Sequence, residues 1–152
     1  MKLLHPIKNC LPEFISAVLI FLFVYTAISK LIDWRTFHYS LSKSPLIGNL
    51  ASFVTWMIPI TEVGIVMLLS LPTMRLLGMF AAFLLFIVFT LYIGYMILFV
   101  PDLPCSCGGI IQQMSWKLHL VFNLFITVIV YAGIYIERQR RNHAASFQTA
   151  DT

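Results

Sequence analysis

The chain has 152 residues, of which 60% are hydrophobic and 11% are charged, and its mean hydropathy is +0.90. A soluble domain cannot bury so large an apolar fraction, so the composition excludes a water-soluble globular protein and indicates that lipid is the solvent. The formal net charge of +4 comes from basic residues scattered over the termini and predicted loops, a pattern that does not favour nucleic acid as a partner.

Four apolar stretches are long enough to cross a bilayer as helices. They run approximately over residues 14–32, 50–71, 76–100 and 118–136. Because a helix of about 20 residues spans the hydrocarbon and satisfies its own backbone, each stretch predicts one transmembrane helix. The sequence therefore predicts an all-α fold, an integral membrane four-helix bundle over residues 1–141, followed by a disordered tail at 142–152.

The basic residues also predict the orientation of the bundle. Four spans place both termini on one side, and Arg138, Arg140 and Arg141 form the strongest basic cluster in the sequence. Basic residues collect on the cytoplasmic side of membrane proteins, so both termini are expected there. The loop before the fourth span then faces the periplasm or cell exterior, and the chain is expected in the bacterial inner (cytoplasmic) membrane.

Two connections between the spans have structure of their own. After the first span, Asp33 is expected to begin a short helix that lies along the outer surface, with Trp34, Phe37 and Leu41 on one side. The second and third spans are joined by the very short turn 71–75, which predicts that they are antiparallel neighbours.

Cys105 and Cys107 lie in the predicted outer loop, directly before Gly108 and Gly109. A disulfide across one intervening residue departs from relaxed disulfide geometry and is easily reduced. The pattern therefore predicts a redox pair that exchanges disulfides, and the alternatives are a strained but inert disulfide or two unreactive thiols. Two thiolates and the imidazole of His119 fall short of a structural zinc site, so no metal is predicted.

The fourth span begins with two polar residues directly after this loop. His119 and Asn123 are four residues apart, so they share one helix face near the outer surface. His119 is a candidate acid or base for a reacting thiol, and Asn123 and Tyr92 are candidate contacts to a quinone headgroup. Hydrogen bonding between helices is the alternative explanation for these side chains.

Glu62 lies in the middle of the second span, where a carboxylate normally faces the bundle interior and has a partner or a proton. A rise of about 1.5 Å per residue places it roughly 18 Å below the outer end of its span. At that depth Tyr25 and Tyr92 are the expected hydrogen-bond partners, whereas Lys30 is expected at the outer interface with its ammonium turned to the headgroups. Either Glu62 fixes helix packing or it carries protons.

Several of these residues also carry a family resemblance. They lie in the segments 25–33, 59–62 and 104–109, and at Trp116, His119 and Asn123. In these segments the chain resembles the MauE family of methylamine-utilisation proteins, within the DoxX-like membrane proteins. The lysine and glutamate positions are shared widely among DoxX-like proteins, whereas paired cysteines before the fourth span are more specific to MauE-like members.

The resemblance implies a role in maturation of the disulfide-rich small subunit of methylamine dehydrogenase, together with a thioredoxin-like periplasmic protein. Cys105 and Cys107 would be the exchanging pair. The leading hypothesis is therefore a thiol-disulfide oxidoreductase component that passes electrons between such a partner and the membrane, with a quinone as candidate acceptor.

Two other functions stay open. The first is a non-catalytic subunit or assembly factor that scaffolds a larger membrane complex, because the sequence lacks the second cysteine pair that membrane enzymes use to relay disulfides. The second is a transporter built on Glu62 and the tyrosines.

Overall fold

The computed structural model describes the backbone of residues 4–100 and 115–150, and the side chains of residues 10–100 and 115–142. These residues form α-helices and one short 3-10 helix, and no strand occurs among them. The elements are α1 (Leu4–Ile32), α2 (Trp34–Ser42), η1 (Gly48–Leu50), α3 (Ala51–Ser70), α4 (Arg75–Phe99) and α5 (Trp116–Ala150). The predicted all-α fold is confirmed.

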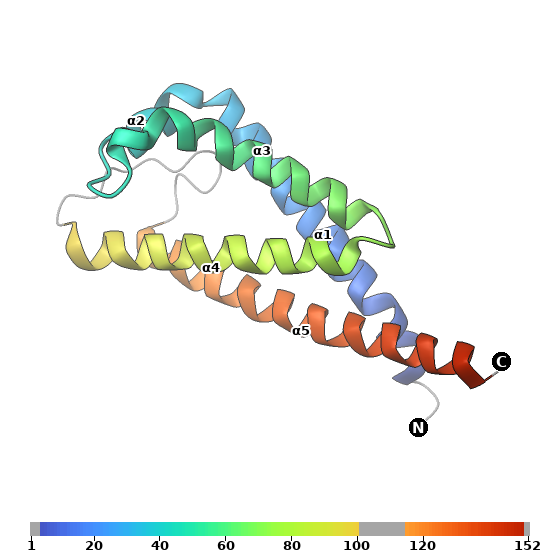
Figure 1. Cartoon of the computed structure of the whole chain (residues 1–152). Helices are drawn as coiled ribbons and strands as arrows, with labels where there is room; N and C mark the ends of the chain where they lie inside the picture. Colours follow the sequence, from blue (N-terminus) through green and yellow to red (C-terminus); the bar gives the residue numbers. More distant parts are fainter. Residues whose placement is uncertain (1–3, 101–114, 151–152) are drawn as a thin grey trace.

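The four long helices pack as an antiparallel bundle (Figure 1). α3 contacts α1 and α4, and α5 contacts the same two helices, so the four helices form a closed ring. Four segments are long and apolar enough to cross a membrane: Cys10–Ile32, Gly48–Ser70, Arg75–Phe99 and Trp116–Asn142. The predicted four spans are therefore confirmed, and the chain is a multi-pass membrane protein.

Both chain ends lie at one end of the bundle, and α2 lies at the other (Figure 1). The helices at the chain ends are longer than the predicted spans, because α1 begins at Leu4 and α5 continues to Ala150. The sequence predicted a disordered tail from residue 142, whereas the structure continues α5 through most of that segment. Ion pairs from Arg140 and Arg141 back to Glu137 support the helix beyond its apolar part.

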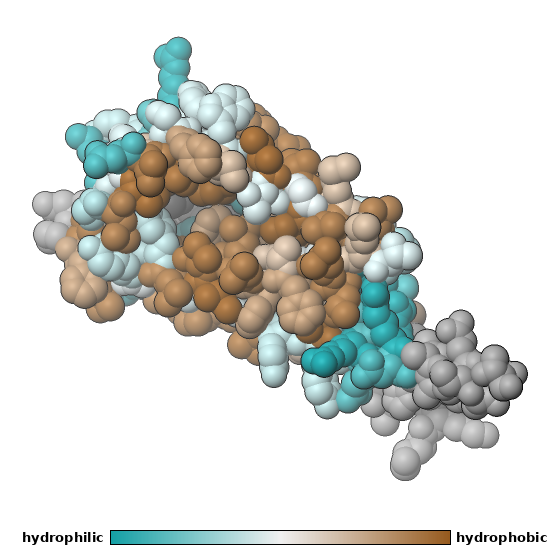
Figure 2. Space-filling view, in the orientation of Figure 1, coloured by the Kyte–Doolittle hydropathy of each residue, from teal (hydrophilic) through white to brown (hydrophobic). Residues whose placement is uncertain are grey.

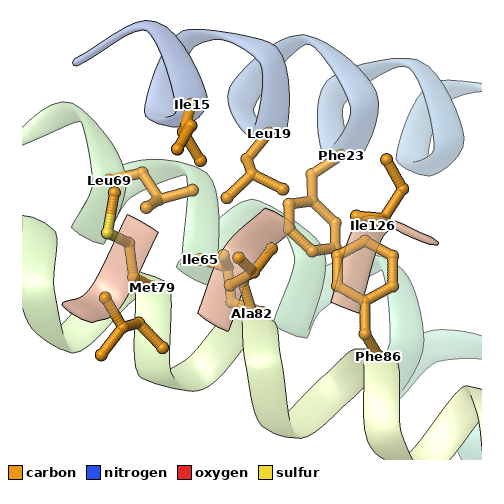
Figure 3. Packing of buried hydrophobic residues seen from close by; sticks show 11 residues of the cluster. Ile15, Leu19, Phe23, Ile65, Leu69, Met79, Ala82, Phe86 and Ile126 are labelled. Atoms are coloured by element: carbon orange, nitrogen blue, oxygen red, sulfur yellow. The ribbon is translucent and has the colours of Figure 1, made fainter. Parts of the chain in front are cut away.

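The core of the bundle is built from side chains that recur every three or four residues on each helix. α1 contributes Ile15, Leu19 and Phe23, α3 contributes Ile65 and Leu69, α4 contributes Met79, Ala82 and Phe86, and α5 contributes Ile126, Val130 and Ile134. Figure 3 shows the α1 side chains pointing at those of α3 and α4, and the rings of Phe23 and Phe86 lie 5.4 Å apart. Helical periodicity places one apolar face of every helix in this core.

The outer face of the bundle is apolar as well. Large hydrophobic side chains such as Phe21, Leu84, Leu91 and Val128 are exposed along the helices. Figure 2 shows a mainly hydrophobic body with hydrophilic residues collected at its two ends. A surface of this kind fits hydrocarbon rather than water.

A polar cluster joins three helices at the end where the termini lie. Arg75 of α4 is 3.3 Å from the carboxylate of Glu13 of α1. Glu137 of α5 is fully buried and pairs with Arg140 and Arg141 of its own helix, each at 3.0 Å. The Arg141 guanidinium also donates to backbone carbonyl oxygens of the α3–α4 turn at 2.9 and 3.2 Å. These contacts fix α1, α4, α5 and the turn relative to one another.

At the other end, α2 packs against the first turns of α3. Phe37 and Leu41 are buried with Ala51, and the rings of Trp34 and Trp56 lie 4.7 Å apart. The short helix expected after the first span is therefore present, with its apolar side on α3.

Gly78 permits a close approach between α3 and α4 near the turn that joins them. A Cβ added at Gly78 would lie 2.9 Å from the backbone nitrogen of Leu69, whereas one added at Gly94, further along α4, meets nothing within 4 Å.

We expect Gly78→Ala to push α3 and α4 apart and destabilise the bundle by about 1–3 kcal/mol. Thermal unfolding in detergent measures this, with Gly94→Ala as the control. Equal melting temperatures for the two variants would contradict the packing described here.

Candidate functional site

An ion pair lies inside the bundle between α1 and α3. The Lys30 ammonium is 2.6 Å from Oε1 of Glu62, and the Thr26 hydroxyl donates to the same oxygen at 3.1 Å. Lys30 also donates to the backbone carbonyl of Thr26 at 3.4 Å. The side chain of Glu62 is 1% exposed and that of Lys30 16%. Burial makes such a pair electrostatically strong, because little water screens the two charges.

The position of Lys30 corrects the sequence prediction. Lys30 was expected to turn to the headgroups, and Tyr25 and Tyr92 were expected to be the partners of Glu62, but the structure pairs Lys30 with Glu62. The prediction estimated the depth of Glu62 from the start of its own span. That estimate does not give the height of Glu62 relative to α1, because the first turns of α3 pack against α2 rather than α1. The contact between His38 and Thr55, at 3.2 Å, belongs to this same upper part of α3. Glu62 therefore comes level with the last turns of α1.

Thr26 is a site residue that the sequence analysis did not single out. Its hydroxyl contacts the Glu62 carboxylate. The sequence spacing could have indicated Thr26, since Thr26 and Lys30 are four residues apart and so share a helix face. A lone threonine in an apolar span is nevertheless common, because its hydroxyl can bond to its own helix backbone, as Thr26 also does with the carbonyl of Phe23.

The start of α5 brings His119 and Asn123 to the same region. The hydroxyl of Ser115 accepts a hydrogen bond from the backbone N–H of Leu118 at 3.3 Å, so Ser115 caps the first turn of the helix. His119 follows one turn later and Asn123 two turns later. His119 and Asn123 line the same cavity as the Lys30–Glu62 pair.

A cavity of about 390 Å³ brings these side chains together. Thr26 and Lys30 of α1, Glu62 of α3, and His119 and Asn123 of α5 line it. The remaining wall is mainly apolar, and Ser40, Tyr92 and Trp116 add further polar atoms. The candidate site residues predicted within the spans, Lys30, Glu62, Tyr92, His119 and Asn123, therefore all face one cavity.

Two buried polar atoms at this cavity have no hydrogen-bond partner among the described residues. They are Oε2 of Glu62 and Nδ2 of Asn123. Glu62 is 1% exposed and Asn123 3%. Buried polar groups are nearly always hydrogen-bonded, so an unpartnered acceptor and an unpartnered donor on one cavity indicate a polar ligand or water there.

The predicted redox pair lies outside the described residues, because Cys105 and Cys107 fall within 101–114. Both residues that flank this segment are described. Val100 is extended, as the residue before a proline prefers, and its N–H bonds to Met96 at the end of α4. Met96 and Trp116, one on each side of the segment, both line the cavity. The two helices on either side of the cysteine segment, α4 and α5, therefore both contribute side chains to the cavity.

Cys10 is the third cysteine and lies far from this site. It is a free, exposed thiol on α1, at the end of the bundle where the chain termini meet. Among the described residues, no group of three or more His, Cys, Asp or Glu side chains is arranged to hold a metal ion.

Comparison with known families places the chain in one of them. The model of the family described as methylamine utilisation protein MauE matches residues 8–136, which includes the four spans and the cysteine segment. The chain belongs to the MauE family. No curated protein and no solved structure matches it. The chain is thus a multi-pass membrane protein of a family linked by name to methylamine utilisation.

The Lys30–Glu62 pair predicts a distinctive pattern of stability. Removing one partner leaves a buried charge unpaired, so Lys30→Met or Glu62→Leu should each destabilise the bundle by about 3–5 kcal/mol. The double variant should recover most of that loss, because no charge then remains. Thermal unfolding of the purified protein in detergent measures all three variants.

Glu13→Gln is the control for this series, since Glu13 is half-exposed and its ion pairs lie at the surface. Its effect should stay within about 1 kcal/mol. If the double variant is as unstable as the sum of the single ones, Lys30 and Glu62 do not act as a pair.

Proposed function

We propose that this protein passes thiol–disulfide electrons between a thioredoxin-like periplasmic partner and a quinone of the membrane, through Cys105 and Cys107. In this way it assists the maturation of a disulfide-containing periplasmic or secreted protein. The observation that supports the proposal most is that α4 and α5, the helices on either side of the cysteine segment, both contribute polar side chains to the cavity. Cys105 is five residues from Val100, so the chain keeps it within about 18 Å of that residue, which directly follows α4.

The chemistry of the exchange is balanced in two steps. A thiolate of the reduced partner attacks the Cys105–Cys107 disulfide, forms a mixed disulfide and releases one thiolate of the pair. The second partner thiol then displaces this bond, which leaves the partner oxidised and Cys105 and Cys107 as two thiols. Transfer of their two electrons and two protons to a quinone restores the disulfide and yields a quinol.

The cellular setting in this proposal follows from charge and from the family. Arg75 and Arg140 pair with Glu13 of α1, and Arg141 donates to the α3–α4 turn. Together with Arg138 of α5, these basic residues favour a cytoplasmic location for the end of the bundle that holds the termini (Figure 1). The cavity and the cysteine segment then face the periplasm from the inner membrane of a bacterium. The family description favours methylamine metabolism as the process served.

Trapping of the exchange intermediate tests the proposal. With Cys107→Ser, a partner cysteine bound to Cys105 cannot be displaced from within the chain, so a mixed disulfide with a thioredoxin-like protein should accumulate on non-reducing gels. Cys105→Ser gives the reciprocal test, and Cys10→Ser is the matched control. Full maturation activity in the double Cys105→Ser/Cys107→Ser variant, together with stable co-purification of a partner, would instead identify a non-catalytic assembly factor.

The orientation gives a second test in intact cells. A maleimide that does not cross the inner membrane should label Cys105 and Cys107 once a reductant has been added. Cys10, at the opposite end of the bundle, should become labelled only after the cells are permeabilised. Labelling of Cys10 alone in intact cells would reverse the proposed topology.

A further inference from the structure

The charges at the cavity restrict the kind of ligand that it can hold. Lys30 and Glu62 compensate each other at 2.6 Å, so the polar part of the cavity carries little net charge. A phosphate headgroup would meet the Glu62 carboxylate, and an ammonium headgroup would meet Lys30. Charged groups are costly to bury without a counter-charge, so the site favours an uncharged ligand.

The hydrogen-bonding atoms define the ligand further. Nδ2 of Asn123 is a donor without a partner in the described part of the chain, so it requires an acceptor. The Lys30 ammonium has three donors, and the described residues supply two acceptors for them, Oε1 of Glu62 and the carbonyl of Thr26. A lipid acyl chain has no acceptor to offer, whereas a ring with carbonyl groups has.

The walls and the access route favour a ligand that arrives from the lipid. The cavity volume of about 390 Å³ falls within the roughly 300–1,000 Å³ typical of small-molecule sites. Its lining is mainly apolar and includes Val88, which is 51% exposed on the outer face of α4. α3 and α4 meet at their turn and diverge toward the α2 end (Figure 1), and residues of both helices line the cavity. The cavity therefore reaches the lipid-facing surface.

We infer that the cavity holds the ring of a membrane quinone, with the Asn123 amide and the Lys30 ammonium donating to its two carbonyl oxygens. Glu62 is a positioning residue that keeps Lys30 charged and in place. A quinone is uncharged, apolar and equipped with two acceptors, which are the properties that the cavity selects. The inference rests on the proposed function only for its source of electrons.

The site residues account for the charge and protons of the reaction. Cys105 and Cys107 lose their two S–H bonds and form one S–S bond, and the two electrons and two protons pass to the carbonyl oxygens as two O–H bonds. The Lys30 charge stabilises negative charge that builds up on an oxygen before its proton arrives. Oε2 of Glu62, unpartnered among the described residues, can accept a hydrogen bond from the O–H that forms.

Binding is tested first on the protein without redox chemistry. The full chain is reconstituted in nanodiscs of phosphatidylcholine and phosphatidylglycerol, with Trp34→Phe and Trp56→Phe leaving Trp116 at the cavity as the single fluorophore of the three tryptophans. Titration with a short-chain ubiquinone should quench Trp116 fluorescence saturably. Asn123→Leu should weaken binding about tenfold, because one carbonyl loses its donor. Val128→Leu, exposed on the outer face of α5 and outside the cavity, should bind as the parent does.

A competing ligand keeps the test decisive even if Asn123→Leu does not fold. An alkylbenzene with the same tail but no carbonyl groups should fail to displace the quinone from the parent protein. Equal displacement by this analogue, quenching that does not saturate, or equal affinity in a folded Asn123→Leu variant would overturn the inference.

The same titration with Cys105→Ser/Cys107→Ser separates this inference from the proposed function. Quinone binding should persist in that variant, because the cysteines supply electrons and not the binding site. Saturable binding together with an inactive thiol exchange would refute the proposed function and leave the quinone site standing. Thiol exchange that proceeds without any quinone binding would refute the quinone site in the cavity but not the thiol–disulfide exchange through Cys105 and Cys107.

Discussion

The Lys30–Glu62 ion pair is the interaction on which the rest of this structure depends. Two charges inside a bundle surrounded by lipid have only each other and a few polar neighbours, so α1 and α3 must be placed to bring them together. That requirement sets the height of α3 against α1 and leaves α2 to cover the upper turns of α3. It also leaves the polar part of the adjoining cavity with little net charge.

The bundle cannot rely on the hydrophobic effect to choose its helix neighbours, because the lipid outside is as apolar as the core inside. Close packing and polar contacts decide the arrangement instead. Gly78 lets α4 approach the backbone of α3 near their turn. At the same end Arg141 holds that turn, and Glu13 joins α1 to α4 and α5. The structure is thus fixed by polar contacts at both ends and by shape between them.

The two ends of the bundle differ in packing: the end near the α3–α4 turn is closely packed, and the α2 end contains the cavity. Near the turn, side chains such as Leu69 and Met79 are buried between the helices. Toward α2, α3 and α4 diverge, and the mainly apolar cavity there also contains polar side chains from α1, α3 and α5. The closely packed end near the α3–α4 turn thus supports a cavity at the α2 end of the bundle.

What the sequence by itself determined was local. Runs of about 20 apolar residues specify spanning helices wherever they occur, so the four spans and the all-α fold were predictable. The short helix after Asp33 followed from its own apolar side, and the face shared by His119 and Asn123 followed from their spacing. Segments 104–109 and 116–123 carried the family resemblance, which the match over residues 8–136 bears out.

What only the tertiary structure decided was which residues meet across helices. Lys30 was expected at the interface because helix length gives a depth only from the start of each span, and nothing in the sequence says that α2 rather than α1 covers the first turns of α3. The height of α3 relative to α1 brings Glu62 into contact with Lys30 and Thr26. The same arrangement forms the cavity that Asn123 lines. Relative helix height depends on packing between segments distant in sequence, and periodicity within one helix cannot encode it.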